Sequence, residues 1–152
     1  MAATRPSTLI AELSYQCPLH CPYCSNPVDI GGERYRSELC TEDWIRAFRQ
    51  ARGLGVLQLA LTGGEPMLRG DLAELCAAAR EAGLYSSLIT AGTLFTPPRA
   101  RALKAAGLDH VQISIQSPYP DDNDRIAGNR SFHKKIAAAR LAKRLGFPLT
   151  IN

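Results

Sequence analysis

The sequence has no long hydrophobic run. No stretch of its 152 residues approaches the roughly 18 consecutive apolar residues that a membrane-spanning helix needs. Residues 1–13 also lack the basic-then-apolar pattern of a signal peptide. These absences predict a cytoplasmic protein that does not act in a membrane.

The sequence also has only a small excess of charge of one sign. The 18 basic and 14 acidic residues leave a formal net charge of +4, and both signs are scattered along the whole chain. A nucleic-acid-binding domain gathers its basic residues into a patch, so we expect no nucleic-acid partner. No repeat or low-complexity tract divides the chain, and residues 1–152 are predicted to form one domain.

Cysteine is present in an odd number, which disfavours a disulfide scaffold. Three of the five cysteines fall within eight residues. Such clustering in a reducing compartment is typical of a metal or redox site.

Short apolar segments alternate with amphipathic helical patterns. Thr41 is the predicted N-cap of one helix, Asp71 of a second, and Thr96 before two prolines of a third. Residues 131–145 form a fourth helical pattern, and Pro27 with the pair Gly31-Gly32 predicts a loop. The strands are predicted at residues 8–14, 56–62, 84–90, 110–116 and 148–152.

This alternation predicts an α/β fold built from parallel βαβ units. The segment 110–116 alternates strictly, so its apolar side chains point one way and its polar side chains the other. A doubly wound sheet needs two apolar faces. We therefore expect a partial parallel (β/α) barrel with a polar, ligand-filled interior.

Cys17, Cys21 and Cys24 follow the first predicted strand with three and two residues between them. In parallel α/β proteins, ligands bind at the carboxyl ends of the strands. Three thiolates on one loop can hold three irons of a 4Fe-4S cluster and leave the fourth iron open. A zinc site stays possible, with His20 or Cys40 as a fourth ligand.

A second alternative uses the same segment as a redox dithiol. The Cys21-Pro22-Tyr23-Cys24 sequence is also that of glutaredoxin-like proteins. Such a dithiol needs a helix that begins at the first thiol, and Ser25-Asn26-Pro27 argues against a helix there. It also leaves Cys17 without a role.

The second predicted strand runs into the sequence Thr-Gly-Gly-Glu-Pro at residues 62–66. Gly63 and Gly64 allow a ligand to approach the backbone closely. The carboxylate of Glu65 can accept hydrogen bonds from an ammonium group. By itself the motif is more often a simple turn before a helix.

Together, the three cysteines, with Tyr23 before the last, and the Gly-Gly-Glu-Pro turn resemble the signatures of radical S-adenosylmethionine (SAM) enzymes. The resemblance implies a 4Fe-4S cluster whose open iron is chelated by the amine and carboxylate of SAM. Reduction of the cluster then cleaves SAM to a 5′-deoxyadenosyl radical, which abstracts hydrogen from a substrate. The chain is therefore expected to be an enzyme.

The resemblance also implies SAM-binding residues. Tyr23 is expected near the adenine, and Ser114 and Gln116 face the ribose or the carboxylate. Arg125 is a candidate for the SAM carboxylate, although a solvated arginine among neighbouring aspartates is an equally good interpretation. Gly63, Gly64 and Glu65 complete the predicted set.

Longer strings, such as those at residues 59–66 and 110–116, look like the family of PqqA peptide cyclases. These radical SAM enzymes of pyrroloquinoline quinone biosynthesis form a carbon–carbon bond between a glutamate and a tyrosine of the PqqA precursor peptide. The resemblance implies the peptide chaperone PqqD and an electron donor such as flavodoxin as partners. Another radical SAM peptide maturase is the alternative.

The chain departs from that family in length. The family's barrel has six strands and precedes a cysteine-rich SPASM domain, whereas here the sequence stops at the fifth predicted strand. We therefore expect an amino-terminal portion that forms no crosslink alone. Cys40 and Cys76 are interpreted as core or helix-face cysteines.

Overall fold

The computed structural model describes residues 5–25 and 37–152, so the loop predicted around Pro27 and Gly31-Gly32 lies outside the described residues. The described part contains one sheet of five parallel strands in the order β1-β2-β3-β4-β5. The predicted partial parallel barrel is thereby confirmed. The strands are β1 (Thr8–Glu12), β2 (Gln58–Thr62), β3 (Tyr85–Thr90), β4 (His110–Ile113) and β5 (Leu149–Ile151).

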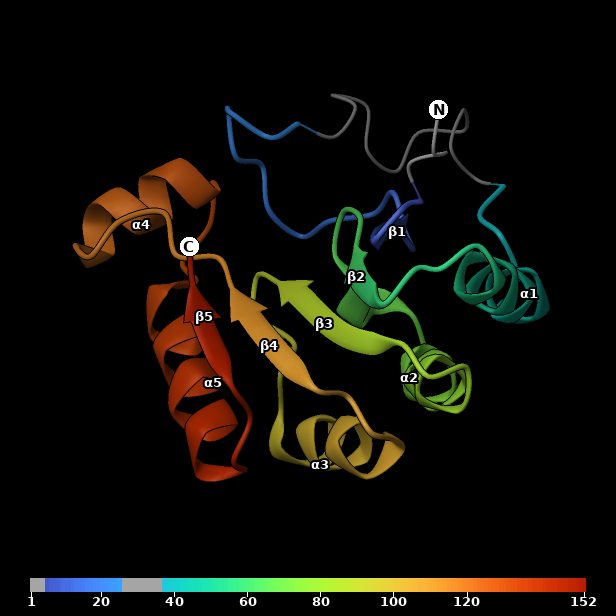
Figure 1. The fold of residues 1–152 in the computed structure, drawn as a ribbon. Helices are drawn as coiled ribbons and strands as arrows, with labels where there is room; N and C mark the ends of the chain where they lie inside the picture. The colour runs from blue at the N-terminus through green and yellow to red at the C-terminus, as the bar shows by residue number, and fades with distance from the viewer. Residues whose placement is uncertain (1–4, 26–36) are drawn as a thin grey trace.

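Helices α1, α2, α3 and α5 follow the outer side of the curved sheet, whereas α4 lies beyond the carboxyl ends of the strands (Figure 1). This arrangement follows from the connections, because each crossover places its helix on the same side of a parallel sheet. The helices are α1 (Thr41–Gly53), α2 (Leu72–Glu81), α3 (Pro97–Ala106), α4 (Pro120–Ala127) and α5 (Phe132–Arg144), with a short 3-10 helix η2 (Pro66–Leu68).

The core lies between the sheet and these outer helices. Alternate strand residues are buried there, including Leu61 on β2, Leu88 on β3 and Val111 on β4, each fully inaccessible to solvent. Phe48 of α1 and Leu75 of α2 pack into the same cluster. Burial of apolar side chains on one face of the sheet therefore fixes which face is left for ligands.

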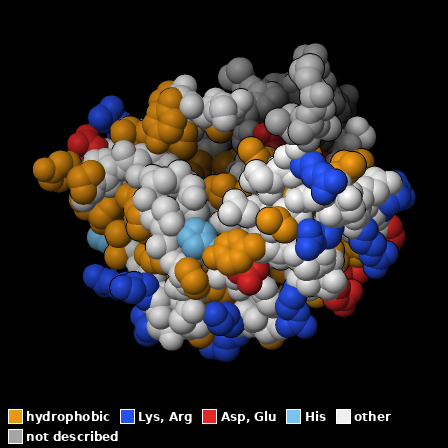
Figure 2. Space-filling model, viewed as in Figure 1, with side chains coloured by type: hydrophobic (Ala, Val, Ile, Leu, Met, Phe, Trp, Pro, Cys, Tyr) orange, Lys and Arg blue, Asp and Glu red, His pale blue; other side chains and the backbone are white. Residues whose placement is uncertain are grey.

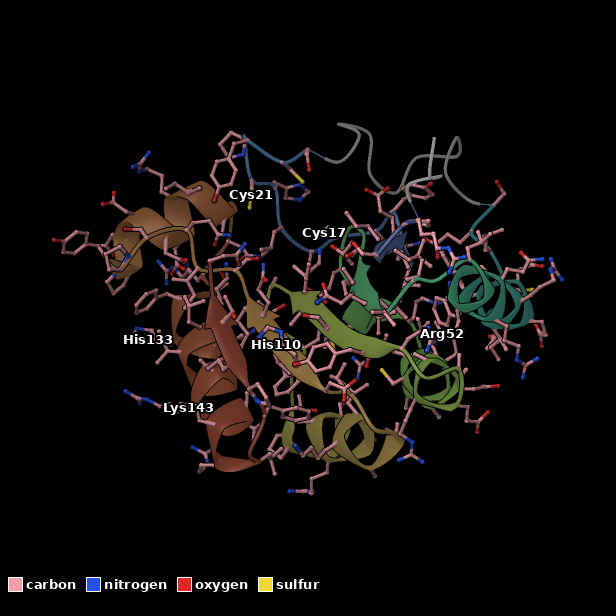
Figure 3. The ribbon with its side chains drawn as sticks, in the orientation of Figure 1. Cys17, Cys21, Arg52, His110, His133 and Lys143 are labelled. Atoms are coloured by element: carbon pink, nitrogen blue, oxygen red, sulfur yellow. The ribbon has the colours of Figure 1, made fainter. Side chains whose placement is uncertain are left out.

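The opposite, concave face carries polar and exposed groups. Ser87 Oγ lies 2.7 Å from His110 Nδ1, and His110 Nε2 lies 3.0 Å from Thr150 Oγ1, which links β3, β4 and β5. Exposed apolar side chains such as Ile10 and Tyr85 share this face. Figure 2 shows hydrophobic side chains around a histidine in the middle of this view, and Figure 3 places His110 on the sheet.

Helix α4, which contains Arg125, was not predicted. It begins at Pro120 and ends before Gly128, which lies in the left-handed region at φ 72°. One predicted N-cap was wrong. Cys40, not Thr41, is the N-cap of α1. Thr41 is the first helical residue, and its hydroxyl instead donates to Asp71 Oδ2 at 2.6 Å.

Within the described ranges, no helix is long and apolar enough to cross a membrane.

Replacement of Leu88 by alanine tests the position of the core. Leu88 lies on the central strand and is fully buried, so Leu88→Ala is expected to lower the free energy of unfolding by about 2–5 kcal/mol. Ile10→Ala is the matched control, because Ile10 is 66% exposed on the concave face, and it should change stability by less than about 0.5 kcal/mol. Urea unfolding measures both, and equal losses would contradict the assignment of the two faces.

Candidate cofactor site

A cavity of about 260 Å³ opens at the carboxyl ends of the strands. Its wall combines the cysteine segment with the ends of β2, β3 and β4, as expected for a ligand site in a parallel sheet. The lining residues are Cys17, Leu19, Cys21, Tyr23, Cys24, Ser25, Thr62, Gly63, Gly64, Ile89, Thr90, Ala91, Ser114 and Gln116.

All three clustered cysteines reach this cavity. Cys17 and Cys21 are half-buried, whereas Cys24 is exposed. The chain turns between the last two, where the Cys24 N–H donates to the Cys21 carbonyl at 3.1 Å. Figure 3 shows Cys17 and Cys21 on the loop that passes over the end of the sheet. The structure therefore brings the predicted metal ligands to one cavity wall.

The cysteine loop is anchored to α4, the helix that the sequence analysis missed. The His20 N–H donates to the Ala127 carbonyl at 3.0 Å, and Asn129 Nδ2 donates to the Pro18 carbonyl at 2.9 Å. Leu19 packs beside Ala127 in a small apolar cluster that Cys17 and Cys21 also contact. The position of the thiols thus depends on a helix about a hundred residues further along the chain.

The environment of the thiols does not match a redox dithiol. Burial raises the pKa of both Cys17 and Cys21 above the ordinary thiol value, whereas a nucleophilic dithiol has a lowered pKa. In the described residues 21–25, no helix begins at Cys21. The two features that activate a dithiol are therefore not found in this segment.

The double-glycine turn lies directly against the segment that leads to the cysteines. The Gly64 N–H donates to the Ser14 carbonyl at 2.6 Å, and the Glu65 N–H donates to the Gln16 carbonyl at 2.7 Å. Gly63 has a φ of 126°, and a Cβ atom at either glycine would overlap backbone atoms of residues 14–16. The predicted close backbone approach exists, but the neighbour that requires it is the chain itself. Both glycines also line the cavity.

The carboxylate of Glu65 is buried and does not line the cavity. One oxygen accepts from the Met67 N–H at 2.9 Å and the Thr90 hydroxyl at 2.7 Å, and the other accepts from the Ala91 N–H at 2.8 Å. Burial raises the pKa of this carboxyl, and the three donors oppose that effect. Glu65 therefore joins the turn after β2 to the end of β3, which the sequence alone did not indicate.

The remaining predicted SAM contacts divide into two groups. Tyr23, Ser114 and Gln116 line the cavity. Arg125 does not, because its side chain projects from α4 into solvent and pairs with Asp122 at 3.0 Å. The structure brings nine of the ten predicted site residues together or directly behind the wall, since only Arg125 lies apart.

Two positioning side chains outside the cavity lining were missed by the sequence analysis. Lys135 of α5 is fully buried and donates to the Gln116 side-chain oxygen. Arg69 donates to the Leu13 and Leu39 carbonyls, both at 3.1 Å, and so links β1 to the start of α1. The burial of a lysine cannot be recognised from a single sequence, because a lysine in a helical segment is normally expected on the exposed face.

The thiols fit an iron–sulfur cluster. Within residues 5–25 and 37–152, no group of three His, Cys, Asp or Glu side chains converges on a single metal-ion position. A cubane cluster needs no such convergence, because each thiolate binds a different iron. Three thiols on one wall of a cavity, with backbone and polar groups on the other walls, leave room for a small molecule beside the cluster.

The fold and the cavity define the class, an α/β partial barrel with a cysteine-lined cavity at the carboxyl end of its sheet. The sequence model of the radical SAM superfamily matches residues 12–152, and the chain therefore belongs to this superfamily. A 4Fe-4S cluster and SAM are the characteristic cofactors of the superfamily.

A curated relative narrows the comparison. The chain is 52% identical over 153 residues to PqqA peptide cyclase of Ruegeria pomeroyi, across 100% of this chain and 40% of that protein. The resemblance to PqqA peptide cyclases is thereby confirmed, and the chain spans 40% of the relative's length.

Two crystal structures of Streptococcus suis SuiB share the fold. The structure with bound precursor peptide SuiA has a TM-score of 0.83 and 26% identity, and covers 97% of this chain and 33% of SuiB. The structure with bound SAM has a TM-score of 0.82 and 25% identity, and covers 97% of this chain and 32% of SuiB.

Replacement of Gly64 by alanine tests the contact between the turn and the cysteine segment. The added Cβ would overlap the Gln16 backbone, so Gly64→Ala should lower stability by about 1–3 kcal/mol and also reduce iron uptake. Gly70→Ala is the control, because nothing lies within 4 Å of a Cβ at Gly70. Thermal melting and the iron content after anaerobic reconstitution measure the two effects. Normal stability and iron content in Gly64→Ala would contradict the contact.

Proposed function

We propose that the protein is a radical SAM peptide-modifying enzyme whose cluster is held by Cys17, Cys21 and Cys24. One observation carries the proposal: these three thiols and the Gly63-Gly64 backbone line the same cavity at the end of a parallel partial barrel. Membership of the radical SAM superfamily supports the same conclusion.

The cavity offers groups suited to each part of SAM. Backbone groups of Gly63 and Gly64 bind the methionyl end beside the thiols, and Tyr23 covers the adenine. Ser114 and Gln116 contribute a hydroxyl and an amide for the ribose or the carboxylate. When bound and reduced, the cofactor pair supplies a carbon radical that abstracts hydrogen, and the walls of the cavity exclude water from it.

The substrate that we propose is a precursor peptide, with a glutamate and a tyrosine joined by a carbon–carbon bond as in PqqA. The bond replaces one hydrogen on each side chain, so the product peptide is lighter by two hydrogens. The identity to PqqA peptide cyclase supports this substrate. The likeness to SuiB, which was solved with its own precursor peptide, supports a peptide substrate more generally.

The proposed partners are the PqqA peptide, the chaperone PqqD and a low-potential electron donor such as flavodoxin. An enzyme that matures a different peptide would need the same cofactors and the same cavity. Peptide specificity therefore has to be tested with the peptides themselves.

Replacement of Cys17 tests the cluster. Cys17→Ala removes one of three iron ligands and is expected to abolish the brown colour and most of the bound iron after anaerobic reconstitution. Cys40→Ala is the matched control, because the exposed Cys40 thiol lies outside the cavity and contacts Asp43. It should bind iron normally. Iron retained by Cys17→Ala would contradict the role of Cys17 as a ligand. A redox dithiol built from Cys21 and Cys24 would instead keep its thiol–disulfide activity in Cys17→Ala.

The reaction is tested by anaerobic incubation with reductant, SAM, PqqA peptide and PqqD. Mass spectrometry is expected to detect 5′-deoxyadenosine from the cluster-loaded protein and none from Cys17→Ala. The enzyme that contains this chain should also yield a peptide lighter by two hydrogens. Cluster-loaded protein that forms no 5′-deoxyadenosine would contradict the proposed function.

A further inference from the structure

Lys135 is a buried cation close to the cysteine loop. It lies on the inner side of α5, and its side chain is completely inaccessible to solvent. In the described part of the chain its ammonium donates to the neutral Gln116 amide oxygen and forms no ion pair with a carboxylate. A buried charge is costly unless an opposite charge compensates it. The buried ammonium of Lys135 therefore implies that an anion binds nearby and compensates its charge.

The charges that surround Lys135 indicate where this anion lies. Burial lowers the pKa of Lys135, and the largest opposing effect comes from Cys21, followed by Asp124, Cys17 and Glu65. Asp124 is committed elsewhere, since its carboxylate accepts from the Ser131 and Phe132 N–H groups at the start of α5. The cysteine thiols are the groups whose charge changes when iron binds, because they bind as thiolates.

Lys135 is separated from the cavity by Gln116. Lysine can only donate, so the side-chain oxygen of Gln116 faces Lys135, and Gln116 itself lines the cavity. The Gln116 backbone is held as well, by a 3.1 Å hydrogen bond from its N–H to Asn123 Oδ1. Lys135 therefore acts on the occupant of the cavity through its charge and through Gln116, not by direct contact.

We propose that Lys135 is a positioning residue whose positive charge stabilises the reduced state of the cysteine-held cluster. This inference rests on the proposed function. In the step concerned, one electron passes from a low-potential one-electron donor to the cluster, no bond breaks and no proton moves. The cluster would gain one negative charge, and the fixed ammonium, buried behind Gln116, would stabilise that charge.

Three variants separate charge from hydrogen bonding. Lys135→Met keeps a similar shape and removes both the charge and the bond to Gln116, whereas Lys135→Gln removes the charge and keeps a side-chain N–H donor. Lys134→Met is the control, because Lys134 is the adjacent lysine on α5 and is exposed. Redox titration followed by electron paramagnetic resonance measures the midpoint potential of the reconstituted cluster in each protein.

Both Lys135 variants are expected to have a more negative midpoint potential. At the wild-type midpoint, their ratio of reduced to oxidised cluster should fall on the order of tenfold, and Lys134→Met should match the wild type. Cluster-free Lys135→Met should melt no lower than the wild type, because it loses an uncompensated buried charge.

Unchanged potentials in Lys135→Met and Lys135→Gln, at normal iron content, would overturn this inference and leave the proposed function intact. Loss of the cluster from both folded variants would also overturn it, because Lys135 would then serve assembly and not reduction. A wild-type protein that binds no cluster would instead refute the proposed function itself.

Discussion

The buried carboxylate of Glu65 is the contact on which the cavity depends. It accepts hydrogen bonds from the Thr90 hydroxyl and the Ala91 N–H and so fixes the end of β3 to the turn after β2. A carboxylate in this position is stable only when donors surround it, because burial without them is costly. The same turn places Gly64 against the Ser14 carbonyl. The turn that carries Glu65 therefore joins the ends of three strands, β3 through the carboxylate and β1 through backbone hydrogen bonds.

The cysteine loop is the second element of the site, and it is supported from the far end of the sequence. A backbone hydrogen bond joins His20 to Ala127 at the end of α4. The next helix, α5, contributes the buried Lys135 behind Gln116. The thiols of the amino-terminal loop are thus positioned by elements that follow β4 in the sequence. Local sequence near the cysteines does not contain the information that orders them.

The sequence predicted the strands, their parallel order and the cysteine site, because these depend on short-range patterns of apolar residues and on spacing. Helix α4 was missed although Pro120, two acidic residues in its first turn and Gly128 at its end are good helix signals. The hydrogen bonds of Glu65 within the chain were not predicted, for a different reason. A carboxylate beside a glycine turn has the same sequence whether it faces a ligand or the chain, and only the positions of Thr90 and Ala91 decide between them.

The central claim is that the three thiolates hold a cluster with an open iron beside the Gly63-Gly64 turn. Pulsed electron paramagnetic resonance of the reduced, reconstituted protein tests it most directly, with SAM isotopically labelled at its methionyl amine. The account predicts a hyperfine coupling between the cluster and the labelled nitrogen. A cluster signal with no such coupling, under conditions where SAM is bound, would contradict it.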